Sequence, residues 1–209
     1  MLFSGRFDPV EIIMLTIAFM AGIAIHEGNH ALVATALGDD TPKQYGRLSL
    51  NPMRHIDIAG IVTFVILGFG WGWTPVTPAK LRPNPIVGNA MVAAAGPLAN
   101  LALAYLLSLP LRAGVTTDPL LHAFLYSAVA LNLLLFAFNL LPIPPLDGFT
   151  VLLGFLPRHL ATSLKRLEPY GAGIIFAMFI LPSLFGSSFS LVGMLFRPVS
   201  MLFGLPQLR

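Results

Sequence analysis

The chain has 209 residues, of which 56% are hydrophobic and 10% are charged. Soluble domains carry about 25% charged residues, so this composition excludes an ordinary soluble protein and indicates an integral membrane protein. The net charge is +3, and the basic residues stand between apolar segments, where they are expected to set membrane topology rather than bind nucleic acid. The chain has no cysteine, so any metal must be held by histidine and carboxylate.

The first apolar segment, from about residue 10 to 37, contains an HExxH pattern at residues 26–30 and ends at a helix-stopping Gly38. Residues four apart on a helix point the same way, so His26 and His30 can bind one metal ion. Glu27 can serve as a general base on a metal-bound water. Three ionisable groups in hydrocarbon cost several kcal/mol unless a partner such as a metal satisfies them.

The rest of the chain alternates apolar and polar pieces. A glycine-rich apolar run, shorter than a full span, is followed by a proline-rich stretch that favours loop or edge strand. Two further spans follow, and the second of them breaks at Pro142, just before Asp147. In order, the pieces are a polar stretch at 41–57, the short apolar run at 58–73, the proline-rich stretch at 74–85, spans at about 86–111 and 120–141, a short continuation at 149–156, a basic loop at 158–168, and apolar runs at about 170–185 and 189–205.

The distribution of lysine and arginine favours five crossings plus one re-entrant element. If the run at 58–73 dips in and returns, nearly all basic residues gather on one side, leaving Arg6 and Arg112 opposite. We therefore expect an all-α integral membrane protein with about five to six transmembrane helices, its N-terminus outside, and a re-entrant or strand-containing loop between the first two core helices. One domain is expected over 1–209, with a catalytic core at about 10–156 and accessory transmembrane helices at about 170–206.

Two histidines leave tetrahedral zinc short of a third protein ligand, and Asp147 is our candidate. It is an acidic residue in a long apolar neighbourhood, and the prolines before it bend the chain, which a membrane tolerates where the chain faces protein or a wet cavity. Glu11, near the start of the first helix, is expected to be an interfacial carboxylate. Other candidates for the third ligand lie near predicted loops or helix ends: His55, His122, His159 and Glu168.

Four motifs resemble those of the site-2 protease family, the zinc intramembrane metalloproteases, in the minimal form without a PDZ domain. They occur in family order and are spread over residues 26–148. The motifs are His26-Glu27-x-x-His30-Ala31; Gly46-Arg47-Leu48-Ser49-Leu50-Asn51-Pro52 with His55-Ile56-Asp57; Ala95-Gly96-Pro97-x-x-Asn100; and Asn139-Leu140-Leu141-Pro142-Ile143-Pro144-Pro145-Leu146-Asp147-Gly148.

The resemblance implies roles for single residues. His26, His30 and Asp147 would bind Zn²⁺, and Glu27 would be the catalytic base. Asn139 would assist binding of substrate or intermediate, although an asparagine bonded to a neighbouring helix explains it almost as well. Gly96 and Asn100 are expected to serve close helix packing, and residues 65–80 could pair with an unwound substrate by strand addition.

The expected function is that of a zinc-dependent intramembrane endopeptidase in the cell membrane. It would be a multi-pass protein surrounded by lipid, its substrates would be transmembrane proteins, and nucleic acid is not expected as a partner. Two alternatives remain at this point: another membrane zinc hydrolase with a different third ligand, and a non-catalytic transporter or scaffold. The zinc content after substitution of Asp147 distinguishes a hydrolase with a different third ligand from the expected endopeptidase. Absence of zinc from active protein would favour the transporter or scaffold.

Overall fold

Three long helices form the centre of the protein, whose computed structural model describes residues 8–49, 51–55, 57–67 and 70–184. They are α1 (Pro9–Ala36), α4 (Pro85–Arg112) and α5 (Pro119–Asn139). In the described part of the chain, these three are long and apolar enough to cross a membrane. The spans expected at 10–37, 86–111 and 120–141 are therefore confirmed to within two residues at each end.

Each of the three helices starts with an Asp-Pro or Asn-Pro pair. The side chains of Asp8, Asn84 and Asp118 accept hydrogen bonds from backbone N–H groups of the first turn. The proline that follows has no N–H to satisfy and its fixed φ suits the helix, so the pair begins a helix without leaving polar groups unpaired.

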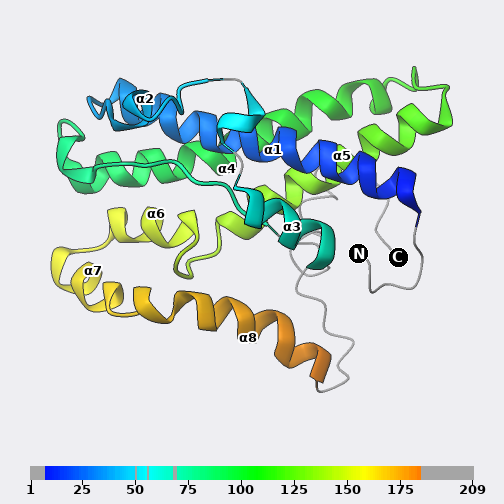
Figure 1. Ribbon diagram of the computed structural model, residues 1–209. Coiled ribbons are helices and arrows are strands. Elements are labelled where there is room, and N and C mark those ends of the chain that lie inside the picture. Colours follow the sequence, from blue (N-terminus) through cyan, green and yellow to red (C-terminus); the bar gives the residue numbers. More distant parts are fainter. Residues whose placement is uncertain (1–7, 50, 56, 68–69, 185–209) are drawn as a thin grey trace.

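Helix α4 lies at the centre and packs against α1, α5 and the short helix α6 (Asp147–Phe155). Figure 1 shows α1, α4 and α5 side by side, with α6 and α8 (Gly171–Leu184) on the opposite side of α4 from α1. The contacts use small side chains, because Ala31, Ala34 and Ala104 are completely buried. Small residues let membrane helices approach closely, and this packing fixes the positions of side chains that face the centre.

Between α1 and α4 the chain forms short elements. They are α2 (Thr41–Gln44), η1 (Pro52–Arg54), α3 (Ile58–Leu67) and η2 (Pro78–Lys80). Helix α3 has 10 residues, about half of the roughly 20 that a full crossing requires. The described residues of this connection contain a single β-bridge residue, Gly72, and no strand, so the strand expected there is not observed.

The prediction of a basic loop at 158–168 is wrong, because this region contains the helix α7 (Arg158–Lys165), which is followed by η3 (Glu168–Tyr170). The helix is strongly amphipathic. Its Ala161 is buried against Phe149 and Leu153 of α6, with Leu164 alongside. Tertiary packing of one short apolar face stabilises this helix, whereas its charged residues alone suggest a loop.

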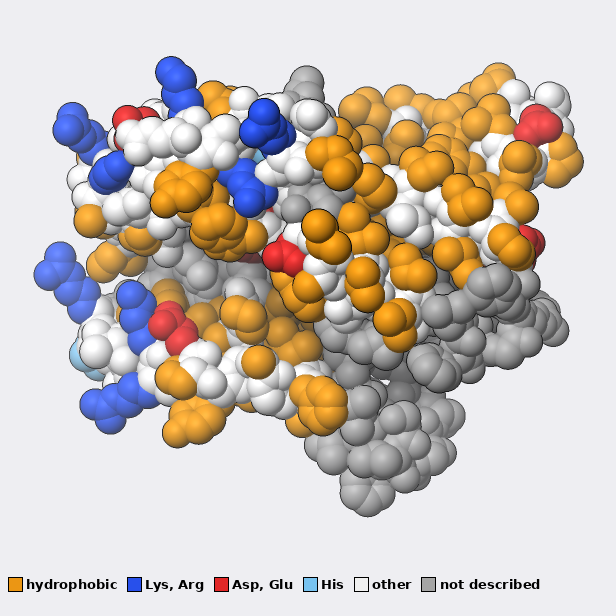
Figure 2. Space-filling model, in the orientation of Figure 1, with side chains coloured by type: hydrophobic (Ala, Val, Ile, Leu, Met, Phe, Trp, Pro, Cys, Tyr) orange, Lys and Arg blue, Asp and Glu red, His pale blue; other side chains and the backbone are white. Residues whose placement is uncertain are grey.

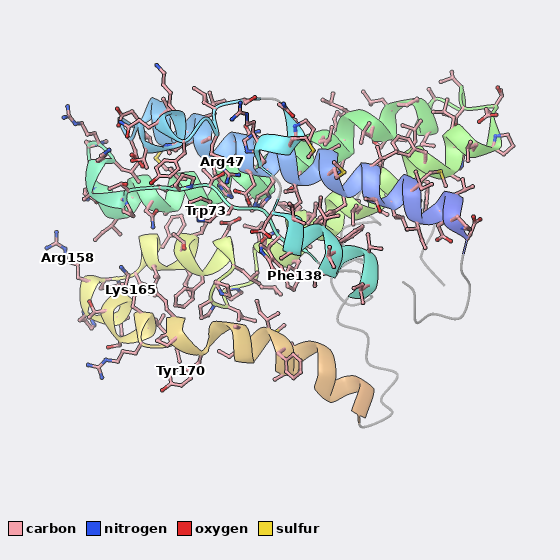
Figure 3. All side chains as sticks on the ribbon, in the orientation of Figure 1. Arg47, Trp73, Phe138, Arg158, Lys165 and Tyr170 are labelled. Atoms are coloured by element: carbon pink, nitrogen blue, oxygen red, sulfur yellow. The ribbon has the colours of Figure 1, made fainter. Side chains whose placement is uncertain are left out.

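The surface separates an apolar part from a basic part. Figure 2 shows hydrophobic side chains over the part of the bundle where α4 and α5 meet, and Lys and Arg side chains gathered at the opposite end. At that end Arg47 lies 5.2 Å above the ring of Trp73, and α7 carries Arg158 and Lys165 (Figure 3). Trp and basic residues concentrate where a membrane meets water, so this arrangement agrees with a membrane protein. The apolar run expected at 189–205 lies outside the described residues.

Candidate metal centre

The two histidines of the HExxH pattern lie on one face of α1, in the middle of the bundle. His26 is 4% exposed and His30 is 7% exposed, and their rings are edge to face with centroids 4.6 Å apart. Asp147, the first residue of α6, reaches them from the opposite side. Its Oδ2 atom lies 3.0 Å from His26 Nε2 and 3.4 Å from His30 Nε2. Residues 121 positions apart in the chain thus meet at one point.

The other ring nitrogens of both histidines face oxygen atoms. His26 Nδ1 is 2.6 Å from Oδ1 of Asn100, and His30 Nδ1 is 2.7 Å from the carbonyl oxygen of Val92. These oxygens only accept hydrogen bonds, so each Nδ1 must carry a hydrogen and donate it. In the neutral ring, Nε2 then keeps a free lone pair, and this is the form of histidine that binds metals.

The three atoms at the centre are therefore all acceptors. Two neutral Nε2 atoms and a carboxylate oxygen face one another without a hydrogen to share, and this is unfavourable unless a cation or added protons compensate. In tetrahedral Zn²⁺ sites with bonds of about 2.0–2.2 Å, ligand atoms are about 3.4 Å apart. The observed separations of 3.0 and 3.4 Å are close to this value, so the three residues could hold such an ion.

Two glycines leave the space in which these side chains meet. A Cβ atom on Gly96 of α4 would lie 2.5 Å from the His30 ring and 2.7 Å from His26 Nε2. A Cβ on Gly148 would lie 2.2 Å from the carbonyl oxygen of Leu140, at the end of α5. Glycine at position 96 allows α4 to approach the two imidazoles, in agreement with the expected packing role of Gly96. Glycine at position 148 allows α6 to start in contact with the end of α5.

Glu27 lines an apolar cavity of about 450 Å³ next to the two histidines. Its side chain lies against Gly72, where a Cβ would be 2.7 Å from Glu27 Cγ and 2.9 Å from Oε1. Thr74 Oγ1 donates a hydrogen bond to the backbone carbonyl of Glu27 at 3.1 Å. The extended segment 70–74 is thus attached to α1 at the residue expected to be the base. The remaining walls come from α1, α5, the proline turn and α8: Ile23, His26, Leu135, Phe138, Asn139, Pro145, Leu146, Ala172, Ile175 and Phe176.

Asn139 lines the same cavity, near the end of α5. Its Nδ2 donates to the carbonyl oxygen of Leu135 one turn earlier in the same helix, at 2.9 Å. This hydrogen bond is formed within α5, so it does not join Asn139 to a neighbouring helix. Asn139, Glu27 and the adjacent Phe138 (Figure 3) all line the cavity.

The alternative third ligands lie away from this centre. Among the described residues, His26, His30 and Asp147 form the cluster whose ligand atoms all come within 4.8 Å of one another, and no alternative joins it. His55 is completely buried, and its Nε2 lies 2.6 Å from the carbonyl oxygen of Ser49, on the other side of η1 in the chain. The others are at helix starts or in short helices: His122 in the first turn of α5, His159 in α7 and Glu168 in η3.

Two asparagines have a closer connection with the centre than the sequence indicated. Asn100 was expected only to pack helices, yet it accepts a hydrogen bond from His26, and Asn132 of α5 bonds to Asn100 in turn. The Gly-Pro-x-x-Asn pattern marks Asn100. Asn132 has no motif around it, and its only signal is an amide within an apolar span.

Comparisons with known proteins agree with the motifs. The family model of peptidase family M50 matches residues 111–182. A Bacillus subtilis protein named "Putative zinc metalloprotease YwhC" is 34% identical over 178 residues, which cover 80% of each chain. The Mycobacterium tuberculosis protein "Putative zinc metalloprotease Rip2" is 31% identical over 194 residues, which cover 88% of this chain and 73% of the relative. No solved structure matches the chain.

A buried histidine pair on a membrane helix, a carboxylate opposite it and a neighbouring glutamate define a membrane metalloprotease. The chain belongs to peptidase family M50, the site-2 protease family.

Proposed function

We propose that this protein is a zinc-dependent endopeptidase that cleaves membrane proteins within or next to their transmembrane segments. Zn²⁺ is its cofactor, and His26, His30 and Asp147 would bind it. The observation that carries the proposal is the convergence of His26 Nε2, His30 Nε2 and Asp147 Oδ2 beside Glu27, inside a bundle of helices long and apolar enough to span a membrane. Buried acceptors without donors call for a cation, and HExxH supplies a base next to it.

When bound, zinc polarises the scissile carbonyl and activates water for attack. Glu27 would take the proton of the attacking water at its carboxylate and deliver it to the nitrogen of the leaving amine. Its position supports this role, since it follows a proposed ligand in sequence and its carboxylate borders the cavity. The buried, apolar surroundings exclude bulk water and strengthen the electrostatic interactions of the site.

The cavity beside Glu27 is suited to an apolar substrate segment. Apart from Glu27, His26 and Asn139, its walls are aliphatic, aromatic or glycine. A helical substrate hides its amides in hydrogen bonds, so it must unwind locally before attack. The extended segment 70–74 would offer backbone groups to the unwound chain by strand addition, and Asn139 would hold the substrate or the tetrahedral intermediate.

We further propose five crossings and one re-entrant element in the cell membrane, in a single domain. The short α3 would be part of the re-entrant element, and the last expected run, 189–205, would be one of the accessory spans. The gathering of Lys and Arg at the end where α1 finishes supports placing that end in the cytoplasm.

The experiment measures zinc content and cleavage separately, on the purified full chain in liposomes with a single-span reporter protein. Wild type should contain about one zinc per chain and cleave the reporter. Glu27→Gln should keep the zinc and lose cleavage by about 10²–10⁴-fold. Full cleavage by Glu27→Gln would remove the proposal. Normal zinc in Asp147→Ala would indicate a hydrolase with another third ligand, and active wild type without zinc would indicate a transporter or scaffold.

A further inference from the structure

We propose that Asn100 and Asn132 form an amide relay that positions His26 for the metal, with Asn132 acting through Asn100. The inference rests on the proposed zinc site, and it assigns roles to two residues that do not touch the ion. Both are positioning residues, because they act on His26 and not on a substrate.

The relay is a continuous set of hydrogen bonds across three helices. It begins in α5, where Asn132 Nδ2 donates to the carbonyl oxygen of Ala128 at 2.9 Å. Asn132 Oδ1 accepts from Asn100 Nδ2 of α4 at 2.8 Å. Asn100 Oδ1 then accepts from Nδ1 of His26 on α1, at 2.6 Å.

The direction of each amide follows from its partners. Asn100 Nδ2 lies between two acceptors, Asn132 Oδ1 and the carbonyl oxygen of Gly22, at 2.8 and 3.0 Å. If the amide were turned over, its oxygen would face both of these acceptors, and its nitrogen would face the ring of His26. The observed orientation leaves Oδ1 as the acceptor for His26, so the relay fixes the hydrogen on Nδ1 and the free lone pair on Nε2.

Burial makes this arrangement rigid. Asn100 is 0% exposed and Asn132 is 1% exposed, so no water competes for their hydrogen bonds. Gly22 provides the space, since a Cβ there would lie 3.1 Å from Asn132 Oδ1 and 2.9 Å from a methyl group of Leu135. Buried polar groups that are fully paired hold one geometry, and groups behind metal-bound histidines set ring orientation and ligand basicity.

The two histidines differ in how they are held. The partner of His30 is a backbone carbonyl, that of Val92, and no side-chain substitution removes it. The partner of His26 is a side chain supported by another side chain. Substitutions of Asn100 and Asn132 should therefore weaken the metal site through His26 alone.

The test measures zinc affinity by competition with a chromogenic chelator, using the purified full-length chain in detergent. Asn100→Ala should weaken zinc binding by about 10–100-fold. Asn132→Ala, and the near-isosteric Asn132→Leu in case the alanine variant does not fold, should cause a smaller, severalfold loss. Because Asn132 acts through Asn100, the double variant should bind no more weakly than Asn100→Ala alone.

Ser108→Ala is the matched control. Ser108 is also on α4 and completely buried, and its Oγ donates to the carbonyl oxygen of Tyr105 at 2.7 Å, but it belongs to no part of the site. Its zinc affinity should equal that of wild type. Equal losses for Ser108→Ala and Asn100→Ala, wild-type affinity in both asparagine variants, or independent losses that add in the double variant would each overturn the relay. If His26→Ala keeps wild-type zinc affinity, it is the proposed zinc site that fails.

Discussion

Asp39 and Asp147 are two carboxylates placed at helix ends whose surroundings are opposite in kind. Asp39, three residues after the end of α1, is completely buried. Its Oδ1 accepts from the backbone N–H of Thr41 at 3.0 Å, and its Oδ2 accepts from that of Thr77 at 2.6 Å. Asp147, at the start of α6, instead has its Oδ2 opposite the Nε2 atoms of His26 and His30.

The difference separates a carboxylate that holds the fold from one that is available for chemistry. Asp39 is surrounded by donors, with Lys80 Nζ also 3.9 Å away, and it ties the end of α1 to the chain that leads into α4. The histidines opposite Asp147 use the hydrogen on Nδ1 for Asn100 and Val92, and their Nε2 atoms face the carboxylate. Burial of a carboxylate is therefore uninformative by itself, and the direction of the neighbouring hydrogens decides its role.

Replacing each carboxylate by its amide should give the largest contrast. Asp147→Asn should reduce zinc affinity by more than the roughly 100-fold that loss of a supporting group costs, because it removes a proposed ligand charge. Zinc content measured after dialysis against a weak chelator checks this. Asp39→Asn is the control and should keep its zinc, and a loss of zinc in that variant would erase the distinction between the two sites.

The space around the histidines gives the next largest effect. Gly96→Ala puts a methyl group within 2.5 Å of the His30 ring, so zinc affinity should fall at least tenfold, comparable to the loss of a supporting group. Gly173→Ala on α8, where a Cβ meets nothing within 4 Å, should keep its affinity and be more stable by about 0.5–1 kcal/mol. Unchanged zinc binding in Gly96→Ala would show that α1 and α4 can separate freely.

A moderate effect is expected on stability at the other carboxylate. Asp39→Asn leaves one of two buried backbone N–H groups without an acceptor, and the free energy of unfolding should fall by about 1–3 kcal/mol. Thermal unfolding in detergent, followed by circular dichroism, measures the change. An equal free energy of unfolding in wild type and Asp39→Asn would mean that Asp39 does not tie α1 to the following chain.

The smallest effect concerns pH. Burial by itself raises the pKa of Asp39, but hydrogen bonds from Thr41 and Thr77 and the charge of Lys80 outweigh it, so this pKa lies below its usual value. The stabilisation is present above the unfolded pKa of about 3.9 and is lost as the pH falls through the lower folded pKa. Between about pH 5 and pH 2, metal-free wild type should therefore lose stability more steeply than Asp39→Asn. If the stabilities of wild type and Asp39→Asn fell in parallel over this pH range, the stabilising role of the ionised Asp39 would be contradicted.

The sequence was most informative where structure depends on near neighbours. The long spans follow from the apolar runs, and the HExxH spacing places two histidines on one helical turn. Helix α7 was missed because its basic residues suggested a loop, although the amphipathic pattern of 158–165 was a signal for the helix that Ala161 anchors on α6. A strand-containing loop was expected within residues 65–80, but the described residues there show only an isolated bridge at Gly72.

The candidate site shows the same limit. Asp147 could be named because prolines and a motif surround it, although its meeting with His26 depends on packing between distant segments. Asn132 and Asn139 lie two turns apart on α5 and are chemically identical. A motif marks Asn139, whereas the role of Asn132 depends on contacts with Asn100, 32 positions away, and no one-dimensional pattern carries that information.

The attachment of the extended segment to α1 links two requirements of catalysis. Thr74 donates a hydrogen bond to the backbone carbonyl of Glu27, and Gly72 lies against the side chain of the same residue. The segment 70–74, which borders the apolar cavity, thus also contacts the residue proposed as the base. In the proposed mechanism, a substrate segment bound against residues 70–74 would also shift Glu27, so substrate binding and the alignment of the proposed base would be coupled.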